Sequence, residues 1–198
     1  MAKQKWKGGA LLAPVPPAMV TCGNDADGTA NIITVAWTGI INTVPPKTYV
    51  SIRPSRHSYA LIRESGEFAI NLTSTDLVRA ADFCGIYTGA KVDKFAKCGL
   101  HKEEASEVSC PIIEESPLSL ECRVTDVIEL GSHHMFLADI VAVDVDEKLL
   151  NNEGKLCLER GKLAAFSHGE YFALGEKIGY FGFSVKKKKK KPKPKKLK

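Results

Sequence analysis

Residues 28–58 read GTANIITVAWTGIINTVPPKTYVSIRPSRHS, and this stretch decides the fold that we expect. Small and bulky residues alternate over 32–37, and a second alternating run covers 48–53. Alternation with a period of two residues is typical of β-strands, and the Pro45-Pro46 pair between the runs predicts a turn. The stretch therefore predicts two strands separated by a proline turn and followed by a helix.

The faces of these two strands carry different side chains. The first strand is expected to direct Trp37 toward a bulky apolar face. Its opposite face carries small side chains, which are Thr34, Ala36 and Thr38. On the second strand, Ser51 and Arg53 share one face, because side chains alternate along a strand. One wall of the expected sheet is therefore flat and ends beside a hydroxyl and a guanidinium group.

Polar residues then gather where the second strand turns into a helix over 59–65. They are Ser51, Arg53, Ser55, Arg56, His57 and Ser58. Ser58 is expected to cap the helix, and the free backbone N–H groups at its start favour an anion. A flat wall beside such a cluster suits a planar aromatic ligand that carries a phosphate. The alternative is a polar surface turn with solvated arginines, and the local pattern alone does not decide between the two.

The rest of the chain supplies further strands and short helices. A strand over 18–23 is expected to form a hairpin with 32–37, and Gly66 is expected to end the first helix. Other strands are expected at 67–72, 118–130 and 135–146, with a second helix from Thr73 or Ser74 to Cys84. These spacings predict a mainly β fold, a mostly antiparallel β-barrel with a few short helices.

Charge divides the chain into a body and a tail. The net charge is +5, but ten lysines lie in the last thirteen residues. Without them the chain has 18 basic and 23 acidic residues, a net charge of −5. We expect one domain over 1–185 and a Lys-rich disordered tail over 186–198. The acidic body indicates no specific nucleic-acid partner.

Several classes of site are disfavoured by spacing. The six cysteines contain no C-x-x-C pair, and the rings of His133 and His134 are expected on opposite faces, so no metal site is expected. There is no G-x-G-x-x-G and no P-loop sequence, and no catalytic triad stands out. Cys84 falls at the end of a predicted helix, where the dipole disfavours a thiolate, so the sequence favours a packing role for it.

The N-terminal segment indicates no membrane anchor or leader. Prolines at 14, 16 and 17 interrupt its apolar run, and no run approaches the roughly 18 apolar residues that a membrane span needs. Together with the unpaired cysteine pattern, this predicts a cytoplasmic protein.

Residues 14–72, with DFCGIYTGAKVDKF at 82–95, resemble the flavin reductase-like family and, within it, the flavoredoxin-like proteins. The resemblance continues weakly to HGEYFALGEKIGYFG at 168–182. It implies an FMN-binding split barrel, which is a Greek-key antiparallel barrel. It also implies a homodimer, with FMN near the interface between the subunits.

The same resemblance implies which residues contact FMN. The block along the isoalloxazine and ribityl groups is matched by Asn31, Thr34, Ala36, Trp37 and Thr38. The phosphate side is matched by Ser51, Arg53, His57 and Ser58. Further positions that the resemblance brings near the flavin are Asn71, Lys94 and Phe95.

Two functions follow from the resemblance. The first is an NAD(P)H-dependent flavin oxidoreductase, in which a hydride passes to N5 of the flavin. The second is a flavoredoxin-type FMN carrier, which exchanges electrons with redox-protein partners without oxidising NAD(P)H directly. Both need the same FMN site, and the sequence leaves both open.

Overall fold

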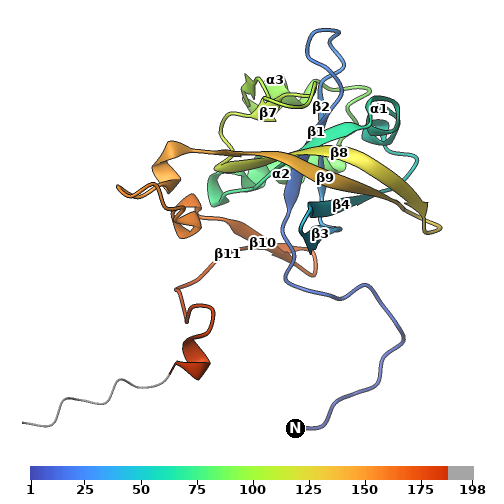
Figure 1. Cartoon of the computed structure of the whole chain (residues 1–198). Helices are drawn as coiled ribbons and strands as arrows, with labels where there is room; N and C mark the ends of the chain where they lie inside the picture. The colour runs from blue at the N-terminus through green and yellow to red at the C-terminus, as the bar shows by residue number, and fades with distance from the viewer. Residues whose placement is uncertain (187–198) are drawn as a thin grey trace, which may run out of the picture.

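A seven-stranded antiparallel sheet forms the centre of the computed structural model, which describes residues 1–186 (Figure 1). Its strands in spatial order are β2 (Asn31–Val35), β1 (Ala18–Cys22), β5 (Glu67–Asn71), β8 (Leu118–Glu129), β9 (His134–Val145), β4 (Pro46–Ile52) and β3 (Thr38–Thr43). The run β5-β8-β9 with β4 beside β9 is a Greek-key arrangement. The predicted mainly β, antiparallel fold is confirmed.

Short helices and small hairpins surround this sheet. The helices are α1 (His57–Ser65), α2 (Val78–Ile86) and α3 (Lys94–Cys98). Two small hairpins are formed by β6 (Lys102–Glu103) with β7 (Ile112–Ile113) and by β10 (Ala164–Ser167) with β11 (Glu170–Ala173). Single 3-10 turns are η1 (Thr75–Leu77), η2 (Glu147–Leu149), η3 (Leu158–Gly161) and η4 (Phe183–Val185).

The sheet curls so that its two edges meet. The edge strands β2 and β3 are consecutive in the chain, and only Ala36 and Trp37 separate them. At this corner the Ser51 backbone N–H donates to the Trp37 carbonyl at 2.9 Å, which ties β4 to the corner. The half-barrel therefore has a seam that β2, the corner and the end of β4 form together.

Three apolar clusters stabilise the fold, and the smallest contains Ala69, Val108, Cys110 and Ile112. The largest lies inside the curled sheet and contains Val20, Ile62, Phe68 and Phe136, all fully buried. The second lies between the sheet and the α2–α3 pair, and it is built on Met19, Ile32, Ala81, Cys84 and Phe95. Burying large side chains of this kind contributes about 1.5–3 kcal/mol each. The second cluster therefore holds α2 and α3 against the outer side of β1 and β2.

The structure corrects several predicted element boundaries. The first predicted strand ends at Val35 rather than at 37, because the chain bends at Ala36 and Trp37 before it enters β3. Trp37 is consequently exposed and does not pack on a bulky inner face. Thr38 starts β3, a strand that the sequence reading missed, so it does not continue the face of Thr34. The helix α3 was missed as well.

The helix ends were predicted with mixed success. Arg56, not Ser58, occupies the N-cap position of α1, and Ser58 is buried in its first turn. Gly66 ends α1 as predicted, with φ 69° and its N–H donating to the Ile62 carbonyl. A 3-10 turn precedes α2, which continues to Ile86 rather than ending at Cys84. The β1–β2 hairpin is confirmed.

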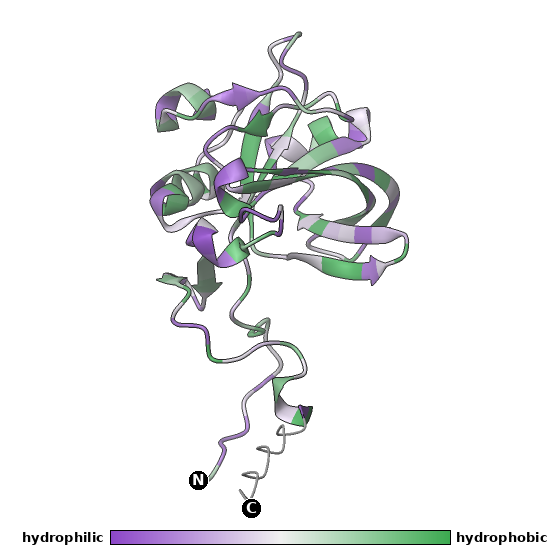
Figure 2. Cartoon of the chain, turned by 60° about the vertical axis from the view of Figure 1, so that its left-hand side comes forward, coloured by the Kyte–Doolittle hydropathy of each residue, from purple (hydrophilic) through white to green (hydrophobic). Residues whose placement is uncertain are grey.

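Segments at both ends of the described chain leave the sheet on the same side (Figure 2). Among residues 1–186, no helix has the length and apolar character needed to cross a membrane. The predicted Lys-rich tail, apart from Lys186, lies outside the described residues.

Candidate functional site

A hollow of about 140 Å³ opens at the seam of the half-barrel. Its walls come from the end of β2, the corner between β2 and β3, the end of β4 and the turn before α1. Residues that line it include Thr34, Ala36, Trp37, Ser51, Arg53 and Arg56. His133, from the turn between β8 and β9, reaches the same hollow. The fold thus brings together residues that are far apart in sequence.

The electrostatics of this seam hollow favour an anion. No carboxylate is among its lining residues, and in the part of the chain that the structure describes neither Arg53 nor Arg56 forms an ion pair. Both guanidinium groups are exposed. Partial burial and the charge of Arg53 lower the pKa of His133 below its ordinary value. Two unpaired guanidinium groups can hold a phosphate by charge-assisted hydrogen bonds.

The turn before α1 explains how the two arginines come to lie together. Pro54 restricts the backbone after Arg53, and the Arg56 N–H donates to the Arg53 carbonyl at 2.9 Å. The helix α1 then begins without a side-chain cap and without an acidic residue in its first turn. Its first N–H groups therefore carry uncompensated partial positive charge beside the arginines.

The wall opposite the arginines is kept flat by α2. Thr34 Oγ1 donates to the Ala81 carbonyl at 2.6 Å, so its hydroxyl is used to hold the helix. Gly85 packs directly on Thr34, where an added Cβ would lie 3.5 Å from the Thr34 Cβ. Thr38 stands apart, because its hydroxyl donates to the Tyr49 carbonyl within the β3–β4 pair. Thr34 and Ala36 are the small side chains that remain at the hollow.

Asn31 and Ser58 form a buried link between β2 and α1. The Asn31 amide donates to Ser58 Oγ at 2.7 Å, which joins β2 to α1. Gly89 lies against the same amide, since a Cβ added there would be 1.9 Å from Asn31 Oδ1. This link fixes α1 and the loop after α2 relative to β2.

Lys94 and Phe95 contact other parts of the fold rather than the hollow. Lys94 is only 3% exposed, and its ammonium donates to the carbonyls of Ile32 and Cys84 at 2.5 and 2.8 Å. Burial lowers its pKa below the ordinary value. Phe95 belongs to the second apolar cluster. Lys94 thus ties α3 to β2 and α2, and neither residue lines the seam hollow.

Asn71 also has a structural network. Its amide donates to the Met19 carbonyl and to Thr21 Oγ1, while its oxygen accepts from the Ile113 N–H and from Ser119 Oγ. These four bonds connect β5 with β1, β7 and β8. His57 is exposed at the first position of α1 and does not line the hollow.

One polar residue at this hollow has no counterpart among the site residues predicted from the sequence. His133 reaches the hollow through the turn that joins β8 to β9. No local signal marks it, since its place depends on the pairing of β9 with β4. Among the described residues, no group of His, Cys, Asp or Glu side chains is arranged to hold a metal ion.

Comparison with known proteins identifies the family. The model of the flavin reductase like domain matches residues 11–174. The chain belongs to the flavin reductase-like family. Its fold is the split barrel of flavin reductases, and the family contains FMN-binding proteins.

Three similar proteins show the range of this family. The structure of flavoredoxin of Desulfovibrio vulgaris (Miyazaki F) is 33% identical and covers 93% of this chain and 100% of its own, with a TM-score of 0.86. An uncharacterized protein of Aeropyrum pernix is 34% identical over 67% of this chain. The matched part covers only 50% of the length of that relative. The reductase component of a 4-nitrophenol monooxygenase from Rhodococcus opacus is 28% identical, over 58% of each chain.

Proposed function

We propose that this protein binds FMN at the seam hollow and transfers electrons through it. The observation that carries the proposal is the pair Arg53 and Arg56, which line the hollow beside Thr34 and Ala36 and have no carboxylate partner among residues 1–186. A dianionic phosphate next to a planar ring system fits this combination of charge and shape. The family membership supports the same cofactor.

Each part of the site has a separate task in this proposal. Arg53, Arg56 and the N–H groups at the start of α1 hold the phosphate, and Ser51 is placed to donate a hydrogen bond. When bound, FMN supplies two-electron chemistry by accepting a hydride at N5. No general acid or base from the chain is required for that exchange, in keeping with the lack of a carboxylate at the hollow. FMN has roughly thirty heavy atoms, and ~0.3 kcal/mol per atom allows about 9 kcal/mol, which is a sub-micromolar dissociation constant.

A second copy of the chain completes the site in our proposal. Pockets that enclose a ligand of this size occupy about 300–1,000 Å³, and the seam hollow has about 140 Å³. One chain therefore supplies only part of the enclosure that FMN needs. Exposed apolar side chains continue from Trp37 along the edge strand β3 and the turn after it, namely Ile40, Ile41 and Val44. This β3 edge suits contact with a second copy of the chain.

The reaction that we favour is reduction of flavin by NAD(P)H. The similarity to a monooxygenase reductase component supports it. The second candidate is electron transfer between redox proteins without direct oxidation of NAD(P)H, and the similarity to a flavoredoxin over the whole of that chain supports this candidate. All six cysteines are free thiols, which suits the reducing cytoplasm that we propose as the location.

Anaerobic mixing with NADH or NADPH tests these functions. The purified protein, loaded with FMN, is mixed with each nucleotide while the flavin absorbance is followed, and free FMN with the same nucleotide is the control. Rapid bleaching beyond the control supports the reductase. Bleaching only by a chemical reductant supports the electron carrier. A protein that cannot be loaded with FMN contradicts both candidates.

A further inference from the structure

Two thiols from separate helices meet beside a hollow that lies between α2 and α3. Cys84 lies in α2, and Cys98 is the last residue of α3. Their sulfur atoms are 4.0 Å apart, although fourteen positions separate them in the sequence. Cys84 is fully buried, whereas Cys98 is partly exposed. The pair therefore has one inner and one outer thiol.

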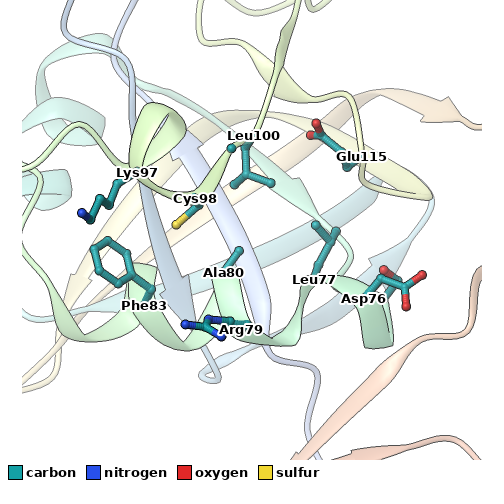
Figure 3. Close-up of a pocket in the computed structure, with 11 residues that line it drawn as sticks. Asp76, Leu77, Arg79, Ala80, Phe83, Lys97, Cys98, Leu100 and Glu115 are labelled. Atoms are coloured by element: carbon teal, nitrogen blue, oxygen red, sulfur yellow. The ribbon is translucent and has the colours of Figure 1, made fainter.

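The outer thiol can be reached by a small reagent. A hollow of about 670 Å³ lies between α2 and α3, and its walls include Leu77, Arg79, Phe83, Lys97, Cys98 and Leu100. Figure 3 shows the Cys98 sulfur pointing into this space, toward Ala80 and Phe83 of α2. Arg79 and Lys97 lie at the same hollow together with Asp76 and Glu115, so its charges balance and it suits a small polar reagent without charge, such as hydrogen peroxide.

A covalent bond between the two sulfurs needs only a small movement. A disulfide has a sulfur–sulfur distance of about 2 Å, so the pair must close by about 2 Å in total. Cys98 is at the end of a five-residue helix, and the following Gly99 has a φ of 64°, so the chain leaves α3 at once. Rotation of the two side chains, with a shift of this one turn, can bring the sulfurs together without moving the sheet.

The other cysteines do not offer this arrangement. Cys22, Cys110 and Cys122 are buried in the apolar clusters of the sheet. Cys157 is partly exposed, but its thiol donates to the Lys155 carbonyl. It is therefore a matched control for a thiol that a reagent can reach but that has a backbone partner.

We propose that Cys84 and Cys98 form a redox-active dithiol, which oxidants of the peroxide class convert to a reversible disulfide. The Cys98 thiol gives up its proton and its sulfur attacks a peroxide oxygen. The O–O bond breaks, Cys98 becomes a sulfenic acid, and the leaving oxygen takes up that proton and departs as an alcohol or water. The Cys84 sulfur then attacks the Cys98 sulfur, Cys84 gives up its proton, and the hydroxyl leaves as water. Two thiols lose two electrons and the peroxide gains them. A small dithiol reductant reverses the reaction.

The order of the two steps follows from burial. A peroxide meets Cys98 first, because its sulfur faces the hollow. Cys84 is protected, and burial raises the pKa of its thiol to about 12, so it is a poor first nucleophile. The carbonyl of Cys84 accepts from Lys94 of α3, so the two helices already meet at this residue. The disulfide adds a covalent link at the same junction.

The test treats the purified full-length chain with a few equivalents of hydrogen peroxide. We expect the intact mass to fall by two hydrogen atoms, a linked peptide pair that contains Cys84 and Cys98, and recovery of both thiols with dithiothreitol. Thermal unfolding should move to a higher Tm after oxidation, because the link constrains the unfolded chain. A chain that keeps all its thiols under these conditions, or links other cysteines, overturns the proposal.

Variants separate the roles of the two thiols. Cys157→Ser should form the linked peptide pair as the wild type does. Cys98→Ser should form none, and Cys84→Ser should gain oxygen at Cys98 rather than a link, because no second thiol is present to trap the sulfenic acid. A Cys98→Ser chain that still links Cys84, or a Cys84→Ser chain whose Cys98 is untouched, contradicts the assignment. If a serine variant fails to fold, the wild-type peptide map and the alanine variants of the same residues decide.

Discussion

Lys94 is a buried cation whose hydrogen bonds hold three elements together. Lys94 belongs to α3, and its ammonium donates to one carbonyl of β2 and one of α2. Removing the donor leaves two buried acceptors unsatisfied, at a cost of about 1–3 kcal/mol for each group. We expect Lys94→Met to lower the free energy of unfolding by about 2 kcal/mol or more, measured by urea denaturation. The exposed Lys97→Met is the control and should change little, and equal stability of both variants would show that Lys94 has no such role.

Asp144 has a partly buried carboxyl group whose ionised form destabilises the folded state. Its Oδ2 is buried and has no hydrogen-bond partner among the described residues. Burial raises its pKa, and the charges of Glu121 and Glu103 add to the effect. A carboxyl with a raised pKa in the folded state favours folding below its ordinary pKa of about 4, and this contribution is lost as the pH rises through the folded value.

We therefore expect Asp144→Asn to raise the free energy of unfolding at neutral pH, because asparagine cannot ionise. The gain should shrink as the pH falls toward about 4, where the wild-type carboxyl is itself protonated. Denaturant unfolding at several pH values measures this, with the exposed Asp126→Asn as the control. A loss of stability at neutral pH, or a gain that does not depend on pH, speaks against this description of Asp144.

At the level of single residues, the sequence predicts the polar cluster at the hollow but not which of the other predicted residues have contacts only within the fold. The polar cluster from Ser51 to Arg56 was predicted from local alternation and turn chemistry, and Ser51, Arg53 and Arg56 do line one hollow. Asn71, Lys94 and Phe95 lie in blocks that match the family, yet their contacts are internal to the fold. A matching block does not reveal whether a residue contacts a ligand or holds the backbone.

Among the elements, the loop after α2 is positioned by a single close approach. Gly89 leaves no space for a side chain, since a Cβ would lie 1.9 Å from Asn31 Oδ1. Asn31 is buried and bonded to Ser58, so it cannot move aside without loss of that bond. We expect Gly89→Ala to destabilise the protein by about 1–3 kcal/mol, seen as a lower Tm. Gly175→Ala, where a Cβ meets nothing within 4 Å, should leave the Tm unchanged, and equal Tm values for the two variants would refute the close approach.

Elements with local signals were predictable, and elements defined by distant pairing were not. The β1–β2 hairpin and the end of α1 at Gly66 follow from turn residues and period-two alternation. The strand β3 has little apolar alternation, because most of its side chains are exposed at a sheet edge. It exists because it pairs with β4, which in turn pairs with β9. The bend at Ala36 and Trp37 has the same non-local cause.

For the whole molecule, the proposal places a second copy against the β3 edge. A charge introduced at Ile40, which is 63% exposed in one chain, should oppose that contact. Burial of such a side chain contributes about 1.5–3 kcal/mol, so we expect Ile40→Lys to weaken self-association at least tenfold and FMN binding with it. Light scattering over a concentration series measures the first effect. Leu156→Lys is the control from outside the β3 edge, and the same mass for wild type and both variants would exclude this edge as the interface.

The order of the family-like segments along the sequence predicts the fold of the whole molecule. It does not predict which residues together enclose the site. Two walls of the hollow are formed by residues from one stretch of sequence, from Thr34 to Arg56. The third contribution, His133, comes from a turn that only the folded sheet brings near. What the sequence could not provide is the geometry of the seam, because it depends on the curl of seven strands.

The central claim is that the guanidinium groups at the seam hold the phosphate of FMN. Titration calorimetry with FMN and with riboflavin, which lacks the phosphate, tests it most directly. We predict that the wild type binds FMN at least tenfold more tightly than riboflavin, and that Arg53→Ala loses at least tenfold in FMN affinity while its riboflavin affinity is unchanged. Arg63→Ala, on the exposed side of α1, should behave as the wild type. Equal wild-type affinity for the two flavins, or unchanged FMN affinity in Arg53→Ala, would contradict the account.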